Sequence, residues 1–70
     1  MKIPANEKIA VTYLNEGVKE YVITHHPLKG KYTLHKIIDD KLQKMKTADT
    51  PIGFDELVEK DRRKQDGKIF

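Results

Sequence analysis

The sequence contains no cysteine, no serine and no tryptophan, and only four glycines. Without cysteine the chain forms no disulfide and offers no thiolate to a metal ion. Without serine or cysteine the common nucleophiles of covalent catalysis are missing, and no glycine-rich segment predicts a cradle for a phosphate or an oxyanion. We therefore expect a protein that is not an enzyme and has no cofactor.

Long apolar runs are also missing. No stretch approaches the roughly 20 apolar residues that span a bilayer. The first residues lack the apolar core of about 7–15 residues that a signal peptide carries. The lack of cysteine fits a reducing compartment. We expect a cytoplasmic protein with no membrane partner.

The 70 residues carry a formal net charge of +3, with 36% charged and 37% hydrophobic residues. This composition predicts a folded chain rather than a disordered one. We expect one small domain, residues 1–70, with short tails at both ends. A chain of this size buries only about 60% of the surface that its unfolded form exposes. It also encloses a ligand pocket of the usual size of about 300–1,000 Å³ only with difficulty, so we expect no small-molecule substrate.

The stretch "KIAVTYLNEGVKEYVITHH" is rich in strand-forming residues on both sides of a turn and predicts a β-hairpin. A three-residue loop, "NEG", with Gly17 in the left-handed region fits that turn. This loop would pair Leu14 with Val18, Val11 with Tyr21, and Ile9 with Ile23. One face would then be buried and contain Ile9, Val11, Tyr13, Tyr21 and Ile23. The other would contain Ala10, Thr12, Glu20, Val22 and Thr24.

A second corner follows at "HPLKGKY". Pro27 has no N–H for a strand ladder and Gly30 tolerates a positive φ, so the strand should stop near His26. A loop over residues 27–30 would pair Ile23 with Leu34 and His25 with Tyr32. The exposed face would then gain Lys31, Thr33 and His35.

Residues 34–46 are open to two interpretations. Apolar residues at 34, 37, 38, 42 and 45 have helical spacing. The segment "YTLHKII" is nevertheless rich in strand formers, and Asp39–Asp40 would make a two-residue turn. We favour two strands, with Met45 opposite Leu34 and Leu42 opposite Ile37. The alternative is a helix, which "TADTP" would join to the next helix in a helix-turn-helix-like arrangement.

The final element is a helix over about residues 51–65. Thr50 followed by Pro51 is typical of a helix start, although Gly53 allows a start at Phe54. Gly67 is a natural stop. The predicted fold is α+β: a three- to four-stranded antiparallel β-meander over about residues 9–47, with one C-terminal helix packed on its apolar face. The predicted core contains Ile9, Val11, Tyr21, Ile23, Leu34, Ile38, Phe54, Leu57 and Val58.

Histidines are the only candidate metal ligands with suggestive spacing. His25 and His26 are adjacent in a strand, so their side chains point to opposite faces. His26 and His35 share a face, but at about 3.3 Å per residue they lie roughly 13 Å apart. One zinc ion cannot span that separation with ligand bonds of about 2.0–2.1 Å, and we expect no metal site.

Lysines supply the main functional signal, because six of them fall within residues 29–46. A lysine-rich sheet face could contact phosphates, or it could be a solvated face that guards a sheet edge. Arginines near the helix end could add to the contact, although positive charge there also complements the helix dipole. The candidate nucleic-acid contacts are Lys29, Lys31, His35, Lys44, Lys46, Arg62 and Arg63.

Exposed sheet edges favour another function. Unpaired N–H and C=O groups along an edge strand can accept a strand from a protein partner or from a second copy of the chain. We therefore expect a small protein-interaction module or adaptor, with nucleic-acid binding as the alternative.

Overall fold

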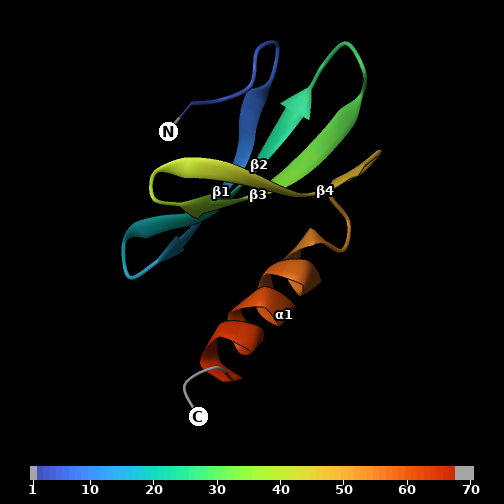
Figure 1. The fold of residues 1–70 in the computed structure, drawn as a ribbon. Coiled ribbons are helices and arrows are strands. Elements are labelled where there is room, and N and C mark those ends of the chain that lie inside the picture. The colour runs from blue at the N-terminus through green and yellow to red at the C-terminus, as the bar shows by residue number, and fades with distance from the viewer. Residues whose placement is uncertain (1, 68–70) are drawn as a thin grey trace.

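A computed structural model describes residues 2–67, with side chains described for residues 2–64. The chain forms one antiparallel sheet of order β1-β2-β3-β4, followed by a single helix (Figure 1). The elements are β1 Lys8–Asn15, β2 Val18–His26, β3 Lys31–Ile38, β4 Lys41–Ala48 and α1 Phe54–Gly67. The predicted α+β meander is therefore confirmed. Residues 34–46 form two strands, so the alternative helix there is wrong.

The β1–β2 turn contains two residues, Glu16 and Gly17, rather than the three that the sequence predicted. Both have positive φ, 53° and 80°, a conformation whose twist matches that of the flanking strands. The predicted register is wrong, because Val11 lies opposite Ile23 instead of Tyr21. The displacement is two residues, so these three side chains still share one face. The other observed pairs include Leu14 with Lys19 and Ile9 with Thr24.

The two later turns follow the prediction. The loop over residues 27–30 is closed at His26, whose carbonyl accepts a hydrogen bond from Gly30 N at 2.8 Å. The predicted pairs Ile23 with Leu34 and His25 with Tyr32 are confirmed. Asp39 and Asp40 form the next turn, both with positive φ (52° and 64°), and Ile37 lies opposite Leu42 as predicted.

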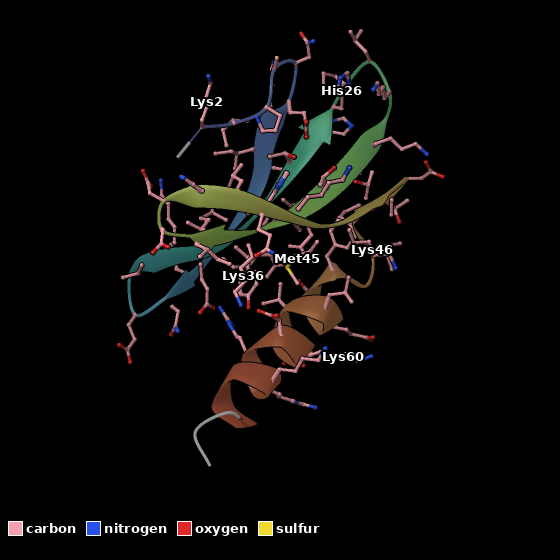
Figure 2. All side chains as sticks on the ribbon, viewed as in Figure 1. Lys2, His26, Lys36, Met45, Lys46 and Lys60 are labelled. Atoms are coloured by element: carbon pink, nitrogen blue, oxygen red, sulfur yellow. The ribbon has the colours of Figure 1, made fainter. Side chains whose placement is uncertain are left out.

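One predicted pair in β4 is wrong. Lys46, not Met45, lies opposite Leu34, because Met45 is an extra residue between the positions that pair with Leu34 and His35. Such a bulge leaves one residue unpaired and changes the face on which later residues lie. Figure 2 shows the Met45 sulfur on the side of the sheet that faces α1.

Helix α1 begins at Phe54, the later of the two predicted starts. The turn before it has Gly53 at φ 88° and a hydrogen bond from Phe54 N to Pro51 O at 3.1 Å. Phe54 and Val58 lie one turn apart and are buried against the sheet, with Leu57 packed beside them. The core beneath them contains Tyr21, Ile23 and Leu34.

Polar contacts attach the next turn of the helix to the sheet. The Asp61 carboxylate accepts a hydrogen bond from the Tyr21 hydroxyl and forms an ion pair with Lys36 Nζ at 2.7 Å. Arg62 Nε donates to Glu20 Oε1 at 2.6 Å, and its guanidinium lies 5.6 Å from the centre of the Tyr21 ring. Burial and the neighbouring Asp61 carboxylate raise the pKa of Tyr21 above its ordinary value.

Three predicted core residues are exposed: Ile9 by 46%, Val11 by 44% and Ile38 by 42%. Ile9 lies opposite Thr24 because Ala10 is an extra residue in β1, so Ile9 is displaced to the other face. Val11 is on an edge strand, and Ile38 precedes the Asp39–Asp40 turn at the end of β3. The predictions for Ile9, Val11 and Ile38 are therefore wrong.

The opposite face of the sheet is also covered, contrary to prediction. Val22, Thr24, Thr33 and His35 were expected on a solvent-facing side, and all four are buried. Residues 2–7 lie on the side of the sheet away from α1 (Figure 1). Thr24 Oγ1 donates a hydrogen bond to Glu7 Oε1 at 2.5 Å, which fastens this N-terminal segment to the sheet. Each face of the sheet is thus covered, one by α1 and the other by the N-terminal segment.

Candidate binding surfaces

The bulge at Met45 separates two of the predicted nucleic-acid contacts. Lys44 lies opposite His35, and Lys46 lies opposite Leu34. His35 and Leu34 are neighbours in a regular strand, so they point to opposite faces. Lys44 therefore lies on the face that residues 2–7 cover, which we call the N-terminal face. Lys46 lies on the face that α1 covers, the helix face. Figure 2 shows Lys46 on the helix side of the sheet and Lys2 on the other.

Three further predicted contacts have acidic partners. Lys31 pairs with Asp49, Arg62 with Glu20, and Arg63 with Glu59 at 4.0 Å. Lys29 is exposed in the β2–β3 loop, so it lies on a different element from Arg62 and Arg63 of the helix. His35 is only 5% exposed, so its predicted place on an open face is wrong. Among the seven, the structure brings together Lys44 and His35.

These two residues line a cleft of ≈ 580 Å³ between the N-terminal segment and the β3–β4 hairpin. We call it the N-terminal cleft. Its volume lies within the range of about 300–1,000 Å³ that small-molecule sites occupy, although the cleft is open to solvent rather than enclosed. The lining residues are Lys2, Ile3, Pro4, Ala5, Glu7, Thr33, His35, Asp40, Lys41, Leu42 and Lys44.

A chain of three hydrogen-bonded side chains forms the buried side of this cleft. Thr24 Oγ1 donates its only proton to Glu7 Oε1 and lies 2.9 Å from His35 Nε2. A hydroxyl whose proton is already donated can only accept from the ring, so His35 carries its proton on Nε2. The other ring nitrogen, Nδ1, is then the hydrogen-bond acceptor of the neutral imidazole.

The environment of His35 favours the neutral ring. Burial lowers the pKa of His35, the Glu7 carboxylate opposes that effect, and the Lys44 ammonium adds to it. No buried side-chain nitrogen or oxygen in the described part of the chain lacks a hydrogen-bond partner. Since His35 lines the cleft and Nε2 bonds to Thr24, its Nδ1 is the ring atom left for a ligand or for solvent.

The other two histidines have different surroundings. The His25 ring stacks on Tyr32, with centroids 4.4 Å apart and an angle of 21° between the planes. His26 Nδ1 accepts a hydrogen bond from Lys29 N at 3.2 Å and thus closes the β2–β3 loop. Within residues 2–67 there is no group of three or more potential metal ligands.

The two edges of the sheet differ in character. Strand β1 exposes Ile9, Val11 and Leu14 and has no charged residue after Lys8, its first. Strand β4 carries three lysines, at positions 41, 44 and 46. Lysines on an edge strand oppose pairing with another chain. The β1 edge lacks that protection, although the extra residue Ala10 interrupts its regular pairing.

Sequence reasoning missed the N-terminal cleft because it treated residues 1–8 as a tail. A weak signal was present, since Ile3 and Pro4 precede the first strand and Ile3 is half-buried in the structure. It also left open which edge of the sheet would accept a partner. The lysine content of the fourth strand could have distinguished the two edges.

Comparison with protein-family models, with curated proteins and with solved structures finds no match to this chain. In the part of the chain that the structure describes, the helix is too short and too polar to cross a membrane. The geometry of the described residues is therefore the basis for assigning a function.

Proposed function

We propose that this chain is a non-enzymatic protein-interaction module that accepts an extended partner strand along the outer edge of β1. The difference between the two sheet edges carries the proposal. Strand β1 has eight residues, pairs with β2 on one side, and is the first strand in the sheet order. Among residues 2–67 no strand pairs with the N–H and C=O groups on its outer side, and a partner backbone can satisfy them.

Apolar side chains add to the attraction of this edge. Val11 points to the helix face with Ile23, whereas Ile9 points to the other face with Thr24. An added strand would therefore meet an exposed aliphatic side chain on each face of the sheet. Pockets for alternate side chains give such strand addition its specificity, while main-chain hydrogen bonds give affinity.

The β4 edge is unsuited to the same role. Lys41, Lys44 and Lys46 would meet the lysines of a second copy, and like charges directly opposite each other destabilise a strand pair. Partner addition is thus directed to β1. The lack of cysteine supports the further proposal that the module works in the reducing cytoplasm.

Nucleic acid is the alternative partner, and the net charge of +3 favours it. The seven candidate residues belong to four elements or loops, and three of them are paired with carboxylates. A titration of labelled protein with a DNA duplex at two salt concentrations tests this alternative. Resonance shifts that fall steeply with salt would support it, because counterion release makes phosphate binding salt-dependent.

The first experiment on the β1 edge asks whether a second copy occupies it. Light scattering over a range of concentrations gives the mass, which is 8.1 kDa for one chain. If the protein is a dimer, Val11→Lys should dissociate it. Val18→Lys is the matched control, because Val18 is also an exposed valine but is the first residue of β2, which is an inner strand of the sheet.

If the protein is monomeric, selection from a library of extended peptides supplies a partner. Binding should slow hydrogen exchange of amides in β1 and should be lost in Val11→Lys but kept in Val18→Lys. Selected peptides that protect no β1 amide, or that bind both variants equally, would contradict strand addition at this edge. A monomer for which selection yields no binder would also contradict it.

A further inference from the structure

We propose that the N-terminal cleft is a binding site for the phosphate group of a small organic phosphate. This inference does not depend on the proposed role of the β1 edge, because the cleft lies between residues 2–7 and the β3–β4 hairpin. Cationic side chains line it, together with the buried imidazole of His35 and a few apolar side chains. The site would be assembled only when the N-terminal segment lies on the sheet.

The charges in the cleft favour an anion. Lys2, Lys41 and Lys44 contribute to the lining, and none of them makes an ion pair with another of the residues that the structure describes. Two acidic residues are also present. Both acids keep their negative charges, although the Glu7 carboxylate is also held by the Thr24 hydroxyl. Three lysines against two acids leave the lining with a formal net charge of +1, which still favours an anion.

His35 makes a phosphate monoester a better match than a carboxylate. The hydrogen bond of His35 Nε2 to Thr24 leaves Nδ1 as the second ring nitrogen, and the neutral ring presents it as an acceptor. A phosphate monoester has its second pKa at about 6 and can therefore carry an O–H donor near neutral pH. An ionised carboxylate has no donor. The phosphate can pass this proton to Nδ1, which then donates to the resulting dianion, whereas a carboxylate has no proton to pass.

The apolar part of the lining indicates the rest of the ligand. Ile3, Pro4 and Leu42 line the cleft together with the lysines. Most small-molecule sites combine an apolar wall with a few polar groups that fix orientation. We infer a ligand with one phosphate and a compact apolar body, for which phenyl phosphate is a suitable probe.

Phosphate binding should change the ionisation of His35. The charged groups around the ring are Glu7, Lys44 and the other lining residues Lys2, Asp40 and Lys41. In the free protein burial and Lys44 disfavour the imidazolium. A phosphate would offset Lys44 and favour the imidazolium, so ligand binding should raise the pKa of His35.

The test is an NMR titration of the full-length labelled chain with phenyl phosphate at pH 6.5. Saturable shifts are expected at Thr33, His35 and Lys44, with the His35 ring nitrogens moving toward their imidazolium values. Inorganic phosphate should bind the same residues more weakly. Benzoate, which keeps the ring but lacks the donor, should bind more weakly than phenyl phosphate.

Lys44→Gln provides the decisive variant, because Lys44 is exposed and a surface substitution should leave the fold intact. It should weaken phenyl phosphate binding about tenfold, the effect of losing one charge-assisted hydrogen bond. Lys29→Gln removes the same charge from the β2–β3 loop and should leave the affinity unchanged. Equal weakening in both variants would show a general charge effect and overturn the site.

Two other results would also overturn the proposal. One is the absence of saturable shifts at about 20 mM phenyl phosphate, which would nearly fill a site with a Kd near 1 mM. The other is tighter binding of benzoate than of phenyl phosphate, which would assign the cleft to carboxylates. Neither result would bear on strand addition at β1, which is measured by mass and by hydrogen exchange.

Discussion

Truncation of Phe54 to alanine should unfold the domain or detach its helix. The Phe54 ring is 1% exposed and packs with Val58 against Tyr21, Ile23 and Leu34. Removing a buried phenylalanine side chain costs about 3–5 kcal/mol, because the loss of apolar burial adds to the cost of a cavity. At roughly 0.05–0.15 kcal/mol per residue, a chain of 70 residues has a total stability of about 3.5–10 kcal/mol. The truncation thus removes a large part of the stability.

Thermal unfolding followed by circular dichroism measures the effect. For a domain of this size each kcal/mol shifts Tm by about 4–8 °C, so Phe54→Ala should lower Tm by at least about 12 °C. Ile52→Ala is the matched control, because Ile52 lies two residues earlier and is 85% exposed. Its effect should stay within about 0.5 kcal/mol. A Phe54→Ala protein with the stability of Ile52→Ala would refute the packing of α1 on the sheet.

Three other predictions follow from the turns, the tyrosine contacts and the buried histidine. Glu16→Asn should stabilise the protein by roughly 0.5–1 kcal/mol, because Glu16 has φ 53° and asparagine tolerates positive φ better than glutamate. Urea unfolding measures the change, and a loss of stability would contradict the two-residue turn. Tyr21→Phe should cost about 1.5–3 kcal/mol by removing a hydrogen bond to the Asp61 carboxylate. Tyr13→Phe, whose contact is exposed, should cost less, and equal costs would show that burial adds nothing to the Tyr21–Asp61 hydrogen bond. The pKa of His35 is lowered in the folded state, so on acidification the imidazole of the unfolded chain is protonated at a higher pH than that of the folded chain. The free energy of unfolding should therefore fall as pH drops below about 6.5. A His35→Gln protein should lose that part of the pH dependence, and an unchanged dependence would show that His35 does not supply it.

Turn chemistry explains which parts of the fold the sequence revealed. Pro27 and Gly30 define the β2–β3 loop, and that loop alone determines that Ile23 lies opposite Leu34. The Asp39–Asp40 turn likewise determines the pairing of the next strand close to the turn. In both cases the conformational preferences of two residues constrain the register of the strands next to the turn.

Bulges explain the pairings that the sequence did not reveal. Three register shifts each depend on a single extra residue, at Ala10 in β1, at Glu20 in β2 and at Met45 in β4. Neither alanine nor methionine is by itself a signal for a bulge. Because a shift of one residue moves a side chain to the other face, Ile9 left the predicted core and Lys46 left the predicted lysine surface.

Burial of the second sheet face was unpredictable for a different reason. An alternating strand indicates that one face is polar, but it does not indicate what covers that face. Thr24, Thr33 and His35 are polar and buried, and hydrogen bonds compensate for their loss of water. The partner of Thr24 is Glu7, which lies in a segment with no periodic pattern of its own.

The same two features determine where a partner can bind. The helix covers the centre of one face and the N-terminal segment covers the other, so neither face offers a broad open platform for stacking bases. What remains is a set of narrower surfaces: the β1 edge and the N-terminal cleft. The bulge at Met45 places Lys44 at the cleft and Lys46 on the helix side. A regular fourth strand would have kept both lysines on one face, where the nucleic-acid interpretation needed them. The observed register is thus consistent with the two proposals, a strand partner at the β1 edge and a small anion in the N-terminal cleft.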